Sequence, residues 1–226
     1  MKLLVVFTFL LLLSACHEST NEGALANTWT TTSTQPQLPS FSQSERGITV
    51  VSEGPRGGQL QTTSGNVIAY RIFRISFTNT NNHTAELELK CNQSTYALLP
   101  SLNDSVTVWL VPDAFAPAAK IDRLNFGIDG LEKLLDTCQN RLPVIHCTLR
   151  PHLTKYAYAV CLYKTKRDLA RALVYFKTPE YPVDFLPYEV FRHSTSTQKE
   201  LALTFGVGID PPNQYALLPI GKITLH

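Results

Sequence analysis

The sequence has almost no net charge and no apolar segment long enough to cross a membrane. It contains 20 Lys and Arg against 18 Asp and Glu, so it produces no strong field that would attract nucleic acid, and we expect no such partner. The longest apolar run, residues 3–13, is interrupted only by Thr8. A membrane-spanning helix needs about 20 residues, so this run is too short to be one.

Sequence motifs of known catalytic sites are missing as well. The chain has no G-x-S-x-G elbow, no H-E-x-x-H pair, no calcium-binding loop and no glycine loop that would hold a phosphate. We therefore expect a protein that is not an enzyme and that needs no cofactor. The alternative is an envelope hydrolase whose active-site residues are scattered along the chain.

The N-terminal residues have the pattern of an export signal. Lys2 precedes the apolar run, and the run ends in Leu13-Ser14-Ala15-Cys16, which resembles the lipobox of bacterial lipoproteins. The resemblance implies that residues 1–15 are a lipoprotein signal peptide and that Cys16 becomes the lipidated N-terminus. The other interpretation is an ordinary secretory signal followed by an unmodified cysteine, although Leu13 fits that cleavage pattern poorly.

Lipidation of Cys16 would hold the protein on a membrane without a spanning segment. The resemblance implies three acyl chains, and two already give stable anchoring. In enterobacterial lipoproteins an aspartate after the cysteine retains the protein in the inner membrane, and here that residue is His17. We therefore expect a location in the cell envelope at the outer membrane, with the bilayer as a partner through the acyl chains on Cys16.

The composition of the chain changes near residue 46. Residues 16–46 are rich in Ser, Thr, Asn, Gln and Pro and lack alternating apolar side chains, which predicts a lipidated, disordered tether. Residues 47–226 are enough for one domain that buries about 70% of its unfolded surface. The chain is thus expected to consist of a signal peptide, a tether and one domain.

Alternating apolar side chains in residues 47–226 predict antiparallel strands. Phe73, Ile75 and Phe77 share one face, with Arg74 and the other polar residues on the opposite face. The same alternation resumes in 85–91 after the polar residues 79–82, which predicts a hairpin. Further strands are expected at residues 106–111, 144–149, 156–163, 170–177, 200–207 and 220–225.

The predicted domain resembles bacterial immunoglobulin-like modules. Tyr96-Ala97-Leu98-Leu99-Pro100 followed by the alternation at 105–108 is similar to their edge turn, and residues 79–82 are similar to their asparagine-rich hairpin. Gly57-Gly58 is interpreted as a turn, and helical spacing behind Asp129 predicts a helix at 130–140. The resemblance implies a mainly β, antiparallel immunoglobulin-like β-sandwich with one short helical insertion, and it carries no function.

Four cysteines follow Cys16, and each lies on an apolar face of its predicted element. An exported protein folds in an oxidising environment, so disulfides are expected, with the pairing left open. A strand-turn-strand hairpin is expected around Pro151, and its register argues against a bridge between the two cysteines that flank it. We expect no metal, because C-x-x-C pairs are missing and the neighbours His146 and Cys147 would face opposite ways on a strand. The four cysteines are Cys91, Cys138, Cys147 and Cys161.

A connection rich in proline and aromatic residues is the candidate ligand-binding segment. Residues 179–191 combine three prolines with four aromatic side chains. This loop either packs over the core or presents its rings to an envelope protein or a glycan. The sequence thus favours a lipid-anchored binding or structural module of the cell envelope with an unidentified ligand. The candidate ligand-binding residues are Tyr181, Phe185, Tyr188 and Phe191.

Acylation of Cys16 is directly testable. Cells that produce the full chain are labelled with a palmitate analogue, and we expect label in the wild type and none in Cys16→Ala, because the thiol is the acceptor of the first lipid. Equal labelling of the two proteins would show that the lipobox interpretation is wrong.

Overall fold

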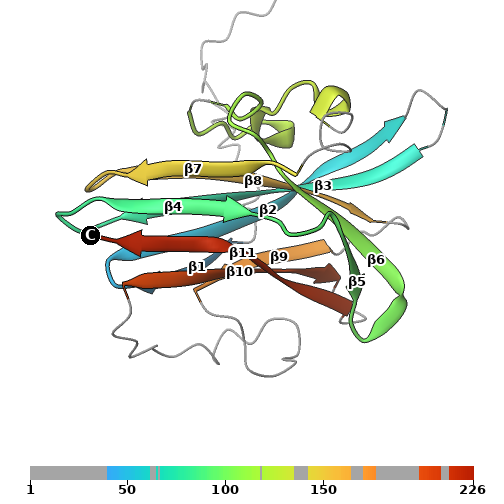
Figure 1. The fold of residues 1–226 in the computed structure, drawn as a ribbon. Coiled ribbons are helices and arrows are strands. Elements are labelled where there is room, and N and C mark those ends of the chain that lie inside the picture. The colour runs from blue at the N-terminus through green and yellow to red at the C-terminus, as the bar shows by residue number, and fades with distance from the viewer. Residues whose placement is uncertain are drawn as a thin grey trace, which may run out of the picture. The chain divides into compact units, whose positions relative to one another are not determined.

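The chain folds into two antiparallel β-sheets that pack face to face (Figure 1). The computed structural model describes residues 40–61, 65, 67–117, 119–134, 142–163, 170–176, 199–209 and 214–226. All of them belong to one structural unit, Gln37–His226. The expected mainly β fold, an antiparallel β-sandwich, is confirmed.

We call the six-stranded sheet A and the five-stranded sheet B. The strand order is β1-β2-β3-β8-β6-β5 in sheet A and β7-β4-β11-β10-β9 in sheet B. Sheet A contains β1 (Ser40–Glu45), β2 (Ile48–Gln61), β3 (Val67–Asn79), β5 (Thr95–Leu98), β6 (Ser101–Leu110) and β8 (Thr154–Tyr163). Sheet B contains β4 (Ala85–Lys90), β7 (Val144–Leu149), β9 (Ala170–Tyr175), β10 (Glu200–Ile209) and β11 (Gln214–Leu225).

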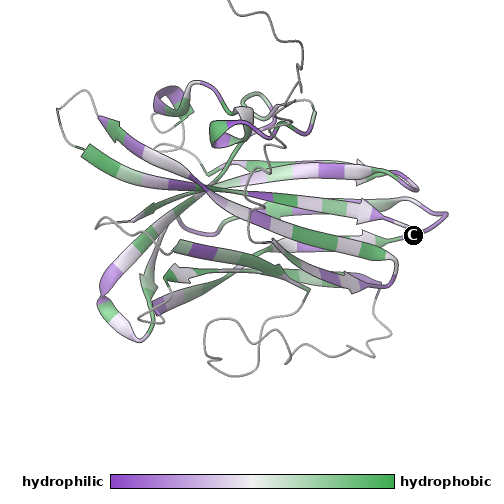
Figure 2. Ribbon diagram, turned by 180° about the vertical axis from the view of Figure 1, so that it is seen from behind, coloured by the Kyte–Doolittle hydropathy of each residue, from purple (hydrophilic) through white to green (hydrophobic). Residues whose placement is uncertain are grey.

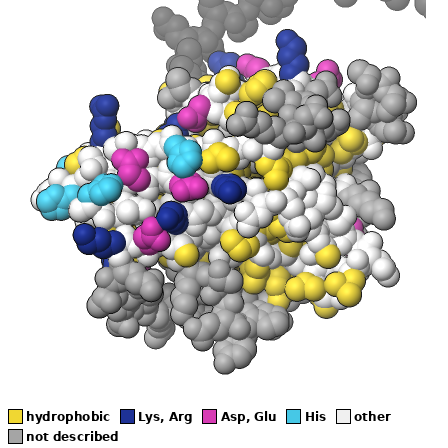
Figure 3. Space-filling view, in the orientation of Figure 1, with side chains coloured by type: hydrophobic (Ala, Val, Ile, Leu, Met, Phe, Trp, Pro, Cys, Tyr) yellow, Lys and Arg dark blue, Asp and Glu magenta, His cyan; other side chains and the backbone are white. Residues whose placement is uncertain are grey.

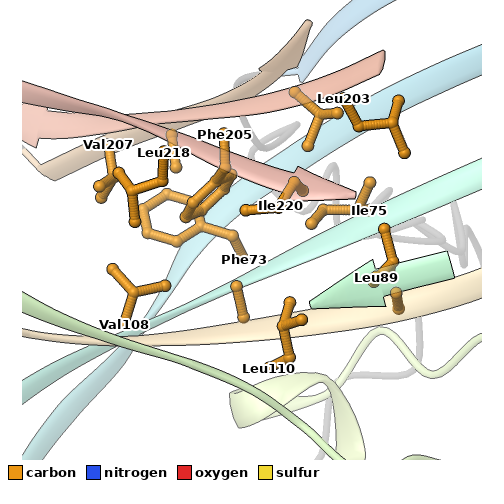
Figure 4. Packing of buried hydrophobic residues seen from close by; sticks show 14 of the residues in the cluster. Phe73, Ile75, Leu89, Val108, Leu110, Leu203, Phe205, Val207, Leu218 and Ile220 are labelled. Atoms are coloured by element: carbon orange, nitrogen blue, oxygen red, sulfur yellow. The ribbon is translucent and has the colours of Figure 1, made fainter. Parts of the chain in front are cut away.

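The main core lies between the two sheets and is built from buried apolar side chains of both. Hydrophobic and hydrophilic residues alternate along several of these strands (Figure 2). Phe73 of β3 meets Phe205 of β10 nearly edge to face, with ring centroids 6.4 Å apart. Each large side chain buried here contributes about 1.5–3 kcal/mol to stability. Figure 4 labels the central members: Phe73, Ile75, Leu89, Val108, Leu110, Leu203, Phe205, Val207, Leu218 and Ile220.

A second apolar cluster covers the outer face of sheet A, beneath the connection from β6 to β7 (Figure 1). We call the described residues of this connection, 111–117 and 119–134, the strap. The strap contains the one-turn element η1 (Leu124–Gly127) and a helix that begins at Leu131, close to its predicted start, while residues 135–140 of the predicted helix are outside the described residues. No helix within the described ranges is long and apolar enough to span a bilayer. The buried members of the cluster are Tyr70, Ile72, Trp109, Val111, Phe126, Ile128, Leu131, Leu134, Tyr158 and Val160.

Two predicted hairpins are wrong, because their strands belong to different sheets. β3 and β8 lie in sheet A, whereas β4 and β7 lie in sheet B, so the chain crosses the sandwich after Asn79 and again at Pro151. The Asn79 side chain is fully buried at the first crossing. Its amide donates to the carbonyls of His83 at 2.7 Å and Leu149 at 2.9 Å. The asparagine side chain therefore provides hydrogen bonds to backbone carbonyls at the point where the chain crosses between the sheets, and it does not shape a hairpin turn.

Two expectations for the N-terminal part of the domain also need correction. Residues 40–45, expected in the tether, form β1, which pairs with β2 from Ser40 opposite Glu53 onward. Gly57-Gly58, expected as a turn, lies inside β2. A Cβ on Gly57, whose φ is 153°, would lie 2.3 Å from the Tyr70 carbonyl oxygen, so the close approach of β3 requires glycine here.

The two sheets are joined at two corners by hydrogen bonds. The Val174 N–H of edge strand β9 donates to the Ser52 hydroxyl of β2 at 3.0 Å. At another corner, Leu99 and Tyr215 exchange two backbone hydrogen bonds of 2.6 Å. These contacts satisfy strand-edge groups that would otherwise be open to pairing with another chain.

Removal of the Ser52 hydroxyl tests the first corner. Ser52 is 3% exposed, so Ser52→Ala leaves the Val174 N–H buried without its acceptor and should lower the free energy of unfolding by about 1–2 kcal/mol. Ser42→Ala, at an exposed position of β1, is the control and should change it by less than about 0.5 kcal/mol. Equal denaturant midpoints for the two variants would contradict the assignment.

Candidate binding site

The strands of sheet A diverge at one end and leave a slot between them. β8 ends at Tyr163, which lies opposite Ala69 of β3 and Val106 of β6. β3 continues beyond this point to Val67 and β6 to Ser101, and the β2–β3 and β5–β6 hairpins splay apart (Figure 1). Since neighbouring strands are about 4.8 Å apart, the walls of the slot start about 10 Å from one another, which leaves room for one strand.

A cavity of about 380 Å³ occupies the slot. Aliphatic side chains of β3 and β8 form most of its apolar surface, and β2 and β6 contribute an amide and two hydroxyls. None of the lining residues that the structure describes is charged, so they suit an uncharged ligand. The lining residues are Gln59, Val67, Ile68, Ala69, Ser105, Thr107, Leu162 and Tyr163.

Exposed apolar side chains occur on both hairpins that flank the slot. Val67, which lines the slot on the β2–β3 hairpin, is 61% exposed, and Leu102 of the β5–β6 hairpin is 75% exposed. The backbone edges of β3 and β6 continue past Tyr163 and flank the slot, and no described strand pairs with them there from the side of β8. Apolar rims beside uncovered strand edges are the features that accept an added strand from another polypeptide.

The floor of the slot is fixed to sheet B by Tyr163. Its ring points into the core, and its hydroxyl donates to the Gly208 carbonyl at 3.3 Å. Burial, and next the thiol of Cys161, raise the pKa of Tyr163 well above its usual value. The phenol therefore remains a neutral donor throughout the physiological pH range and ties β8 to β10.

A buried arginine holds the strap against the same sheet. The Arg74 side chain of β3 is 1% exposed, and its Nε donates to Glu53 of β2 at 2.5 Å. Its Nη2 donates to Asp122 of the strap at 2.8 Å, and its Nη1 to the Ile121 carbonyl at 3.0 Å. A buried guanidinium is tolerated only with such partners, so Arg74 fixes β2, β3 and the strap together.

Phe126 of the strap is in contact with two guanidinium groups. The Arg74 and Arg56 groups are each 4.7 Å from its ring centroid. The backbone of Asn125 and Phe126 is left-handed, with φ of 58° and 54°, which is unfavourable for a bulky residue. Tyr70 secures this turn through a hydrogen bond from its hydroxyl to Asn125 Oδ1 at 3.1 Å. We call these two arginines, Phe126, Glu53 and Asp122 the Arg74 cluster.

The outer face of sheet B is polar and carries charges of both signs (Figure 3). Lys222 pairs with Glu200 at 2.7 Å, and Glu88 lies between Lys222 and His146 in the register. A shallow hollow of about 380 Å³ is present between these strands. Because charges of both signs alternate on this surface and face water, it does not favour ligands of either charge.

The sequence-predicted site residues are distributed unevenly in the structure. Cys16, Cys138 and the four aromatic residues Tyr181, Phe185, Tyr188 and Phe191 are outside the described residues. The structure holds the remaining three cysteines, Cys91, Cys147 and Cys161, as thiols. Within the described ranges, no three His, Cys, Asp or Glu side chains gather as metal ligands.

Sequence reasoning did not reveal the slot or the Arg74 cluster. The slot is built from the ends of strands in two hairpins, so no local pattern marks it. Alternation placed Arg74 on the polar face of its strand, opposite Phe73. The signal for its burial is the apolar character of Tyr70 and Ile72, which share that outward face.

Comparisons of the chain with protein-family models, with curated proteins and with solved structures gave no significant match. Functional inference therefore depends on the sequence and the geometry alone.

The ion pair between Arg74 and Asp122 predicts a pH-dependent contribution to stability. The hydrogen bond from Arg74 holds the pKa of the Asp122 carboxyl below its usual value. Because the pKa is lower in the folded state, the stabilisation is complete above the unfolded pKa of about 3.9 and is lost as the pH falls through the folded pKa.

Asp122→Asn should therefore lower the free energy of unfolding by about 1 kcal/mol at pH 7, since the carboxylate is half exposed. The difference from the wild type should shrink as the pH falls from about 5 to 3. Asp113→Asn, which removes an exposed partner of Lys155, is the control and should have a smaller effect. A difference that stays constant between pH 7 and 3 would contradict this role of Asp122.

Proposed function

We propose that this protein is a lipid-anchored binding module of the cell envelope that takes an extended, uncharged polypeptide segment into the slot of sheet A. The lipobox supports the anchoring, and Cys16 is the residue that would carry the lipid. The observation that carries the binding proposal is the strand-wide slot, with its uncharged described lining residues and with edges of β3 and β6 that pair with no described strand beyond Tyr163. The partner is another envelope protein that presents such a segment.

The geometry of the slot defines the chemistry of its ligand. An added strand would follow the line of β8 and pair with β3, β6 or both, so its backbone would supply the hydrogen bonds. Its side chains would alternate between the two faces of sheet A, with apolar residues against Val67, Ile68 and Leu162. A charged segment would lose its hydration without finding a counter-charge among the described lining residues.

Peptides selected on the immobilised domain from a random library test this proposal with a defined probe. Val67→Glu places a charge at the rim of the slot, at a position exposed enough to tolerate it. We expect Val67→Glu to weaken binding of a selected uncharged peptide at least about tenfold, which corresponds to about 1.4 kcal/mol. The matched control is Leu153→Glu at the opposite end of the sandwich, where the leucine is 55% exposed, and it should leave the affinity unchanged.

Hydrogen exchange of the backbone amides locates the bound peptide. We expect the peptide to slow exchange in residues 67–69 and 101–106 and to leave the β7–β8 turn unchanged. Equal binding to both glutamate variants, or binding only of envelope glycans, would reject the slot as the site. Loss of palmitate labelling in Cys16→Ala tests the anchoring separately, so the two parts of the proposal can fail independently.

A further inference from the structure

The β2–β3 and β5–β6 hairpins are almost without charge. Residues 57–70, which contain the end of β2 and the start of β3, include no Asp, Glu, Lys or Arg, and neither do residues 91–103, which contain β5 and the start of β6. Since 17% of the chain is charged, two segments of this length would ordinarily hold about four or five charges. The charge nearest to the hairpin ends is Asp104, whose carboxylate accepts a hydrogen bond from the Ser105 N–H at 2.9 Å.

The same two hairpins carry exposed apolar side chains. Of the large hydrophobic side chains that are exposed in the described part of the chain, half lie here. They are Val67 at the start of β3, and Leu99 and Leu102 at the end of the β5–β6 hairpin. Single exposed hydrophobic residues need no explanation, but three on neighbouring hairpins without charges form a candidate contact surface.

Leu102 lies in a bulge of β6. Ala97 of β5 lies opposite Ser105 of β6. The next residue of β5, Leu98, lies opposite Ser101, so three residues of β6, including Leu102, have no partner on β5. A bulge bends its strand away from the neighbour, and this one leaves the Leu102 side chain in solvent.

The two hairpins are close enough for one flat surface to touch both. Both β3 and β6 extend past the end of β8, so the hairpins project from the same end of the sandwich (Figure 1). Val67 and Ser105 line the same cavity, and Leu102 is three residues from Ser105, which is at most about 11 Å along the chain.

The other described surfaces carry charges that would lose their hydration against an apolar layer. Arg46, Arg150 and the exposed His152 lie at the opposite end, where hydrogen bonds join the β1–β2, β3–β4 and β7–β8 turns. The strap carries Lys120 and Asp122, and the outer face of sheet B carries charges of both signs. Figure 3 shows hydrophobic side chains over the β5–β6 hairpin and histidine and basic side chains at the opposite end. Contact through the hairpins therefore costs the least hydration.

We propose that the β2–β3 and β5–β6 hairpins rest on the bilayer, with Val67, Leu99 and Leu102 entering the headgroup region. Three apolar side chains bind a bilayer only weakly. A domain that is already anchored through Cys16 has a high local concentration at the surface, so a weak contact is sufficient to orient it. The inference takes from the proposed function only the presence of a bilayer. It does not depend on whether the slot binds a peptide.

Hydrogen exchange on vesicles tests this orientation. A hexahistidine tag that binds a nickel-chelating lipid replaces residues 1–15, and Cys16→Ser removes the acceptor thiol, so the domain is held at the bilayer whether or not cells acylate it. The vesicles contain about three parts phosphatidylethanolamine to one part phosphatidylglycerol, which offers the basic end of the domain an anionic surface as well. We expect the amides of residues 99–104 to exchange at least about threefold more slowly on the vesicles than in solution, and those of residues 150–154 to be unchanged.

Leu102→Asp separates docking from the function of the slot. Leu102 is exposed and is not among the described residues that line the cavity. The variant should therefore fold and bind a selected peptide normally without vesicles, while it loses the slower exchange on vesicles. The matched control, Leu153→Asp at the opposite end, should keep it. Slower exchange in residues 150–154 in place of the hairpins, equal protection in the two variants, or no protection in the wild type would overturn the proposal.

Discussion

The architecture depends on one constraint, which is that sheet A carries apolar side chains on both of its faces. Its inner face packs against sheet B, and its outer face presents Ile72, Tyr158 and Val160, each fully buried. A sheet with two apolar faces needs a second covering layer, because exposed apolar area of this extent promotes association. The strap supplies that layer, and the remaining features of this side of the molecule follow from the need to hold it in place.

The Arg74 cluster shows how a polar group can fasten an apolar cover. A guanidinium without partners in this position would cost several kcal/mol in lost hydration. Here it receives a carboxylate from β2, a carboxylate from the strap and a strap carbonyl, so its hydrogen bonds specify where the strap lies. The apolar contacts alone would favour coverage without fixing its register. The left-handed backbone at Phe126 is compatible with this picture, because strain persists only where the surroundings determine the conformation.

The sequence predicted which side chains are buried far better than which strands are neighbours. Alternation identified the inward faces of β3 and β4 correctly, but a strand's own pattern carries no information about the sheet to which its partner belongs. Polar residues 79–82 therefore suggested a hairpin, although Asn79 is buried and serves a crossing between sheets. β1 was missed because an edge strand with polar side chains has the composition of a tether. β2 was missed because its Gly57-Gly58 pair suggested a turn. The structure shows that Gly57 is required by the close approach of β3, which no local pattern reveals.

The slot could not be predicted for a related reason, since its three surfaces are held by contacts made elsewhere. One wall, the β2–β3 hairpin, is clamped at its base by the strap through Arg56 and Tyr70. The other wall, the β5–β6 hairpin, is tied to sheet B where Leu99 pairs with Tyr215, and the floor is tied to Gly208 through the Tyr163 hydroxyl. Each tie joins segments far apart in sequence, so the slot exists only after the whole sandwich has formed. Walls fixed in this way lose little conformational freedom when a ligand enters. They should therefore bind a ligand more tightly than a flexible pair of hairpins with the same side chains would.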